Sequence, residues 1–162
     1  MTTPRLGAHI PWAQVATCLA PALELGLAPE IAIKGPELDV IAEQAILQTA
    51  EVLAQAGVRP RVHAPFFDLN PGALDPLIRQ ATGQRLEQTL RVASLMHADL
   101  MIIHPGVDKW RYPGLEDTWL NLALDFFPPL VEQAERCNCR LAIENIYEES
   151  PDTLVRLADG AQ

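Results

Sequence analysis

Residues 100–106 read LMIIHPG, an apolar run that ends in a histidine and is closed by a proline–glycine pair. A second apolar run, LAIEN at residues 141–145, ends in a glutamate and an asparagine. The apolar residues of both runs are continuous and do not alternate with polar ones. Continuous runs are typical of strands buried on both faces, as in parallel sheets covered by helices. These two stretches therefore predict a parallel sheet.

Outward from these runs, the chain alternates short apolar stretches with longer segments of helical period. The expected strands are residues 6–10, 30–34, 61–64, 100–104 and 140–146. The expected helices are residues 13–25, 38–56, 75–97, 116–137 and 151–159. This βαβαβαβαβα order predicts an α/β fold, either an open doubly wound sheet of the flavodoxin type or part of a barrel. The first strand is not followed by a glycine-rich loop, which argues against a nucleotide-binding open sheet.

Residue types predict further details of three helices. Gly83 could divide the third expected helix into two pieces. Pro128 and Pro129 are expected to break or kink the fourth, because proline lacks a donor and clashes with the preceding turn. The expected buried face of the second helix is Ile41, Ala45, Val52 and Ala56. That of the third is Leu86, Leu90, Ala93 and Met96.

Composition and charge narrow the class of protein. The chain has 162 residues, of which 49% are hydrophobic, enough for one domain with a sizeable core. Its net charge of −9 argues against a nucleic-acid partner and suits a site that gathers metal cations. The sequence contains no signal-peptide core, no apolar run of membrane-spanning length and no CxxC pair. We expect a cytoplasmic protein with reduced thiols and no membrane partner.

Polar side chains that suit chemistry stand at the ends of the expected strands. Reactive groups of parallel barrels and sheets lie at the C-terminal ends of the strands. The residues at those ends are His9, His63, His104 and the pair Glu144 and Asn145. Imidazole and carboxylate groups suit Zn, Mn, Co or Fe at neutral pH. The sequence therefore predicts one divalent metal ion bound by His63, His104 and Glu144, with a position left open.

Each of these residues also has a purely structural interpretation. A strand-end histidine often does no more than bond to the backbone. Glu144 is the sharpest candidate, because a carboxylate after a buried strand is costly unless it is paired or coordinated. Trp12 and Phe66 lie just past strand ends, where they could wall a ligand pocket or simply pack against the core. His97 stands at a helix end, where a structural role suits it.

Three motifs together resemble a known superfamily. VHAP at 62–65, IIHPG at 102–106 and AIEN at 142–145 are similar to the third, fourth and fifth strands of xylose-isomerase-like barrels. The superfamily includes sugar-phosphate isomerases/epimerases, ketose epimerases, inosose dehydratases and endonuclease IV. The resemblance covers the whole chain in order. It implies a (β/α)8 TIM-barrel-type fold with sugar chemistry that depends on a divalent metal.

The resemblance also implies roles for single residues. Glu144 resembles the fifth-strand glutamate, a metal ligand close to the proton-transfer chemistry, so it is the expected catalytic residue. His63 and His104 resemble histidines that bind one zinc ion in endonuclease IV, whereas in single-metal epimerases these positions face the substrate pocket or are replaced. His9, Asn145, Trp12 and Phe66 are expected to contact substrate.

The expected function is that of a divalent-metal-dependent sugar or sugar-phosphate isomerase/epimerase that moves a proton through an enediolate. The segment from Glu144 to Glu148, with the Ser-Pro-Asp-Thr-Leu that begins at Ser150, reads like the isomerase-type members. One alternative is an endonuclease IV-like metal-dependent phosphodiesterase that acts on abasic DNA. Another is a non-catalytic partial barrel that serves as an oligomeric or binding module.

Length is the main departure from the family pattern. A full barrel needs eight βα units and roughly 250 residues. We expect residues 1–162 to form a single domain that is truncated after the fifth unit. The family's later strands supply an aspartate, histidines and a second glutamate, so this form is expected to bind metal weakly and to be inactive or nearly so. A homo-oligomer could complete the barrel.

Overall fold

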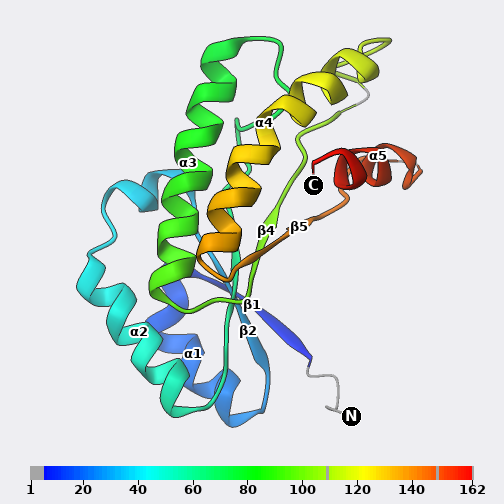
Figure 1. Cartoon of the computed structure of the whole chain (residues 1–162). Helices are drawn as coiled ribbons and strands as arrows, with labels where there is room; N and C mark the ends of the chain where they lie inside the picture. Colours follow the sequence, from blue (N-terminus) through cyan, green and yellow to red (C-terminus); the bar gives the residue numbers. More distant parts are fainter. Residues whose placement is uncertain (1–5, 109, 149, 162) are drawn as a thin grey trace.

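The computed structural model describes residues 6–108, 110–148 and 150–161. The strands are β1 (Gly7–Pro11), β2 (Ala28–Ala32), β3 (Arg61–His63), β4 (Leu100–Ile103) and β5 (Arg140–Ile143). The α-helices are α1 (Val15–Glu24), α2 (Glu43–Gln55), α3 (Pro76–Leu95), α4 (Glu116–Arg136) and α5 (Asp152–Gly160). Short 3-10 helices precede α1 and α2, at η1 (Trp12–Gln14) and η2 (Gly35–Asp39). The predicted alternation of strands and helices is confirmed (Figure 1).

The order of the strands decides between the two predicted architectures. All pairings are parallel, and the order across the sheet is β1-β2-β3-β4-β5, so each strand lies beside its neighbour in the sequence. A flavodoxin-type sheet has the order 2-1-3-4-5, so that alternative is wrong. Helices α1 to α4 lie together on one side of the sheet (Figure 1). The chain forms five βα units of a barrel wall, with β1 and β5 at its two edges among the described strands.

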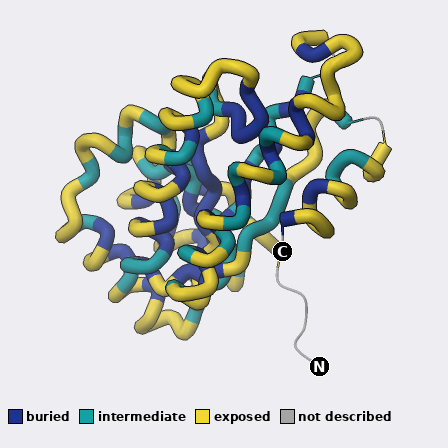
Figure 2. Tube along the Cα trace, turned by 45° about the horizontal axis from the view of Figure 1, so that its top comes forward, coloured by how far each residue is buried: buried dark blue, intermediate teal, exposed yellow. Residues whose placement is uncertain are grey.

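The core lies between the sheet and these helices. One residue from each of the first four strands faces the helices in aligned register, and all are at most 3% exposed: Ile10, Ile31, Val62 and Met101. The predicted stripe of α3 is confirmed, because Leu86, Leu90, Ala93 and Met96 are also at most 3% exposed. Buried residues run along this layer, and exposed ones lie on the outer helix faces (Figure 2).

The two expected helix breaks are wrong, whereas a kink at Pro128 and Pro129 stays a prediction. Helix α3 runs unbroken through Gly83, and α4 runs as one helix through Pro128 and Pro129. A proline inside a helix costs about 3 kcal/mol. In α4 the buried side chains of Phe127 and Leu130 hold the segment against the core on both sides of the prolines. Tertiary packing therefore outweighs the local preference.

The predicted buried face of α2 is also wrong. The buried residues are Ile46, Thr49 and Leu53, whereas Val52 is 42% exposed. Ile41 lies before the first residue of the helix, so the predicted stripe began outside the helix and was out of phase with it.

The predictions about compartment are only partly addressed. Within the described residues, no helix is both long and apolar enough to cross a membrane. Cys18, Cys137 and Cys139 are free thiols. Burial, together with nearby Cys137, raises the pKa of Cys139 to about 11, which keeps this thiol protonated at neutral pH. The cytoplasmic location stays a prediction.

Candidate metal centre

Three consecutive strands carry the predicted metal ligands at their C-terminal ends, which lie at the same end of the sheet. His63 is the last residue of β3, His104 follows β4 directly, and Glu144 follows β5 directly. His63 pairs in register with Ile102, which pairs in turn with Ala142. Side chains two residues apart on a strand share a face, so all three candidate ligands point to the face opposite the core.

The three side chains meet at one atom. Nε2 of His63 and Nε2 of His104 each lie 3.0 Å from the same oxygen, Oε2 of Glu144. One potential ligand atom from each residue lies within 4.8 Å of the others, which is close enough for one cation to be shared. The structure thus brings together the residues that the sequence predicted as a group. We call His63, His104 and Glu144 the metal triad.

The hydrogen bonding of His63 suits a metal ligand. Its Nδ1 lies 2.9 Å from the carbonyl oxygen of Ala64. A carbonyl oxygen only accepts, so Nδ1 carries the hydrogen, and in the neutral ring Nε2 presents a lone pair. A lone pair that faces a carboxylate oxygen needs a proton or a metal cation between them. Metal-binding histidines characteristically donate their second ring N–H in this way, which fixes the tautomer and the ring orientation.

The electrostatics of the site favour a neutral His104 and an ionised Glu144. Burial, aided by the positive charge of His63, lowers the pKa of His104, although Glu144 and Glu148 oppose this. For Glu144, burial acts to raise the pKa, but hydrogen bonds and charge from His63 and His104 outweigh it, and the pKa lies below its ordinary value. A neutral imidazole and an ionised carboxylate are the states that coordinate a cation. The residues present therefore fit a divalent metal.

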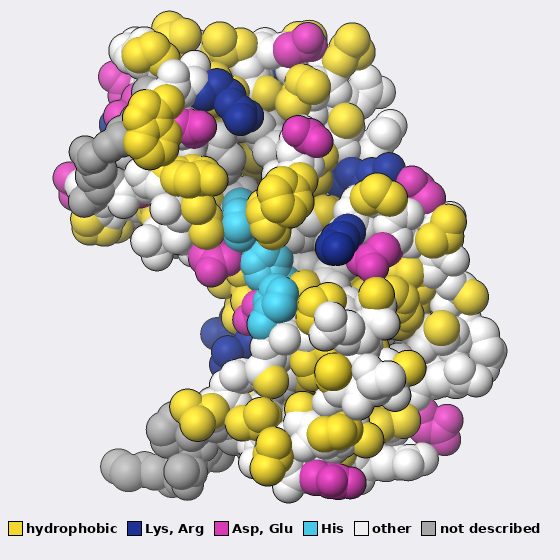
Figure 3. All heavy atoms as spheres, turned by 180° about the vertical axis from the view of Figure 1, so that it is seen from behind, with side chains coloured by type: hydrophobic (Ala, Val, Ile, Leu, Met, Phe, Trp, Pro, Cys, Tyr) yellow, Lys and Arg dark blue, Asp and Glu magenta, His cyan; other side chains and the backbone are white. Residues whose placement is uncertain are grey.

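Aromatic rings extend the metal triad on two sides. Phe66 stacks on His104 with ring centroids 4.0 Å apart and an angle of 18° between the planes. On the other side, the ring of His9 lies 5.6 Å from that of His63, edge to face. Nδ1 of His9 also lies 3.1 Å from Oε1 of Glu30. Seen from behind, histidine side chains form a continuous line beside a hollow in the surface (Figure 3).

Two further residues, Asn145 and Trp12, were predicted to contact substrate. Asn145 is exposed and directly follows Glu144. Trp12 lies in η1, partly buried against the hydrophobic core. Their contacts with substrate stay predictions, as do those of His9 and Phe66. Sequence reasoning missed Glu30, the partner of His9; its one signal was its place beside the apolar residues of the second strand.

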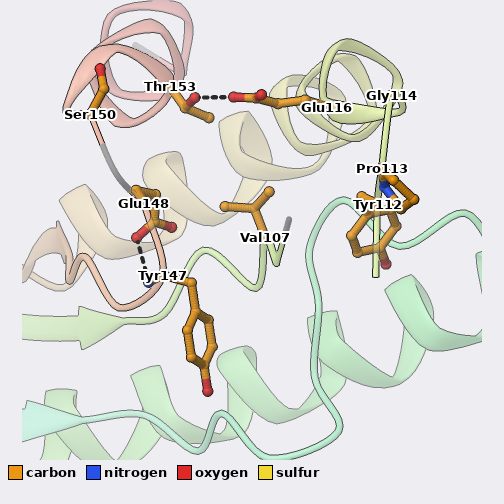
Figure 4. A pocket seen from close by; sticks show the side chains of 9 residues that line it. All are labelled: Val107, Tyr112, Pro113, Gly114, Glu116, Tyr147, Glu148, Ser150 and Thr153. Carbon is orange, nitrogen blue, oxygen red and sulfur yellow. Dashed lines mark hydrogen bonds between the residues drawn. The ribbon is translucent and has the colours of Figure 1, made fainter. Parts of the chain in front are cut away.

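A cavity of about 350 Å³ lies among the loops that follow β4 and β5. Tyr147 and Glu148 line it from one side and Tyr112 from the other (Figure 4). Oε2 of Glu148 accepts hydrogen bonds from the backbone N–H groups of Ile146, at 2.7 Å, and Tyr147, at 3.1 Å. The backbone of its own loop therefore orients this carboxylate. Glu148 lies four residues after Glu144 in the sequence.

The fold and the site together define a parallel α/β barrel protein with a candidate metal site at the C-terminal ends of its strands. Residues 21–162 match the family model described as "Xylose isomerase-like TIM barrel". The chain belongs to this family.

Relatives share the fold at low sequence identity. The chain is 23% identical to the TTHB071 protein from Thermus thermophilus, determined after soaking with ZnCl2, with a TM-score of 0.83 over 97% of this chain. It is 12% identical to D-psicose 3-epimerase in the presence of D-fructose, with a TM-score of 0.79 over 98% of this chain. An uncharacterized Methanocaldococcus jannaschii protein is 28% identical over 85 residues, 52% of this chain and 29% of that protein.

The relatives are longer than this chain. The chain covers 62% of the Thermus protein and 60% of the D-psicose 3-epimerase. The likeness therefore concerns about three-fifths of each of these structures.

Proposed function

We propose that this chain carries the metal-binding half of a divalent-metal-dependent isomerase or epimerase that acts on a sugar or sugar phosphate. The observation that carries the proposal is the meeting of His63 and His104 on one oxygen of Glu144 at the C-terminal edge of a barrel sheet. Structural neighbours that bear epimerase names support the sugar class.

The metal triad would hold the cation, which we expect to be Zn, Mn, Co or Fe. When bound, such an ion supplies Lewis-acid polarisation of a carbonyl and its neighbouring hydroxyl. The chain's own contribution is to present two imidazoles and an ionised carboxylate at one point. Glu144 lies on the open side of the triad, with its side chain 45% exposed. This exposure supports the proposal that Glu144 holds or moves a substrate proton.

Substrate would lie over the exposed side of the metal triad. His9 and Asn145 offer polar groups beside His63 and Glu144, and Phe66 covers His104 with an apolar ring. Trp12 is proposed as a more distant part of the same wall. A face that combines apolar rings with a few convergent polar groups suits a small polar molecule such as a sugar.

A homo-oligomer is proposed to supply what the five βα units do not. Strand β5 pairs only with β4 among the described strands, so its other edge offers free backbone groups. Sedimentation velocity of the pure 162-residue chain should show dimers or larger species at micromolar concentrations. A single well-behaved monomer across that range would contradict completion by a second copy.

A phosphodiesterase that acts on abasic DNA is the second candidate, and the ligand set favours it. Two histidines and one glutamate meeting at one point resemble the endonuclease IV-type centre more than the single-metal epimerase centre. The acidic charge of −9 weighs against it, because a DNA-binding face needs many phosphate contacts.

One paired assay separates the two candidates. The chain is incubated with Zn²⁺, Mn²⁺ or Co²⁺ and either ketoses in deuterated water or a duplex with an abasic site. We expect slow, chelator-sensitive exchange of substrate hydrogen with solvent, little net turnover and an intact duplex. Chelator-sensitive cleavage of the duplex without exchange would favour the phosphodiesterase. Glu144→Gln should remove whichever activity is seen; an activity that survives this change would place the site elsewhere.

A further inference from the structure

The side chain of Asn70, in the loop after β3, is 4% exposed and hydrogen-bonded at both of its polar atoms. Its Nδ2 donates to the carbonyl oxygen of Gly106 at 2.9 Å and to the hydroxyl of Tyr112 at 2.7 Å. Its Oδ1 accepts from the backbone N–H of Gly72 and from Nε1 of Trp119, both at 2.9 Å. One buried amide thus ties together its own loop, the loop after β4 and helix α4.

Close packing around this amide makes the arrangement specific. Gly106 has φ of +79°, and an added Cβ would come within 3.0 Å of Asn70. A Cβ on Gly72 would come within 2.5 Å of the backbone oxygen of Trp119. The backbone N–H of Asn70 is also fixed, since it donates to Oγ1 of Thr82 on α3. Both loops are therefore held in one conformation.

The loop after β3 contacts His104 and a nearby residue, Gly106, at two points. Gly106, which accepts from Asn70, lies two residues after His104. Phe66, four residues before Asn70, stacks on the His104 ring. His104 follows the end of β4, so these contacts from the loop after β3 set where its ring points.

We propose that Asn70 is a positioning residue that acts through Gly106 to hold the imidazole of His104 against Phe66 and toward Glu144. An effect of Asn70 on metal affinity rests on the proposed function. Its effect on the orientation of the His104 ring does not. Loss of outer partners of metal ligands typically weakens metal affinity about 10–100-fold, and we expect Asn70→Asp to fall in that range. This variant keeps the size of the side chain and turns both donors into an acceptor that repels the Gly106 carbonyl.

Chemical labelling of His104 tests the positioning without metal. The chain is treated with diethyl pyrocarbonate, and modification of each histidine is followed by mass spectrometry. The side chain of His104 is 14% exposed, and we expect its modification to become several-fold faster in Asn70→Asp. His97, which is exposed at the end of α3, serves as the internal reference and should not change.

Two control variants separate positioning from general loss of stability. Thr89→Val removes a fully buried hydroxyl that donates to Arg85 O within α3, so it should lower the unfolding temperature and leave His104 labelling unchanged. Tyr112→Phe removes one acceptor of Asn70 but keeps the bond to Gly106, so it should also leave labelling unchanged. If Asn70→Asp does not fold, Gly106→Ala replaces it and should likewise speed labelling of His104.

The outcomes distinguish this inference from the proposed function. Faster labelling of His104 in Asn70→Asp, together with a changed visible spectrum of added Co²⁺, supports both. Faster labelling in a chain that binds no Co²⁺ supports the positioning role and overturns the metal proposal. Unchanged labelling in Asn70→Asp, with a loss of stability like that of Thr89→Val, overturns the positioning role.

Discussion

Glu144→Gln is expected to reduce the affinity of the chain for Zn²⁺ or Co²⁺ by at least about 100-fold, the upper end of what loss of an outer partner costs. Oε2 of Glu144 lies 3.0 Å from Nε2 of both His63 and His104, and the carboxylate is the one anionic group of the metal triad. An amide of the same size keeps the shape but brings no negative charge to a divalent cation. Competition with a chromophoric chelator at neutral pH measures the affinity.

Glu132→Gln is the matched control. Its side chain is 72% exposed on α4 and makes a surface pair with Arg136, so it changes the net charge by the same amount away from the metal triad. Its metal affinity should equal that of the parent. Equal affinities of the parent and Glu144→Gln would show that Glu144 is not a ligand, whatever its position.

Trp119→Ala is expected to lower the free energy of unfolding by about 3–5 kcal/mol, the usual cost of truncating a buried aromatic residue. Trp119 is fully buried on α4, and its indole N–H bonds to Asn70. The change leaves a cavity and removes one donor from the amide that holds two loops. Small domains are stable by only about 5–15 kcal/mol, so this loss should remove a large share of the free energy of unfolding. Urea denaturation followed by circular dichroism measures the loss.

The same substitution at an exposed position provides the comparison. Trp110 is 70% exposed and its ring contacts Tyr147 edge to face, so Trp110→Ala should cost about 1 kcal/mol, well below the cost at Trp119. Similar losses for the two variants would mean that Trp119 is not a core residue in solution.

Local sequence determined the elements and the residues of the site. In the apolar run at residues 100–103, Met101 and Ile103 are buried, and Leu100 and Ile102 are partly exposed. Polar side chains stand at or directly after the last residues of β3, β4 and β5. His63, His104 and Glu144 could be identified as a group because strands of parallel sheets end at the same edge. The positions of these groups along the chain were therefore enough to predict that the three side chains lie together.

Where the chain offered only a local preference, prediction was less successful. Gly83, Pro128 and Pro129 are poor helix residues, yet α3 and α4 run through them. Burial of neighbouring side chains contributes more than these residues cost, and that burial depends on the sheet beneath. The predicted buried face of α2 was out of phase, because the spacing of apolar residues alone does not show where the helix starts.

Contacts between segments far apart in the sequence decided the order of the strands and the surroundings of Asn70. Whether β1 lies at the edge or inside the sheet depends on contacts between distant segments, and only the order β1-β2-β3-β4-β5 distinguishes a barrel wall from an open sheet. Asn70 has no signal of its own in the sequence, where Asn-Pro-Gly reads as an ordinary turn. Its role emerges because folding brings Gly106 and Trp119 to its amide, and a buried amide is stable only when such partners surround it.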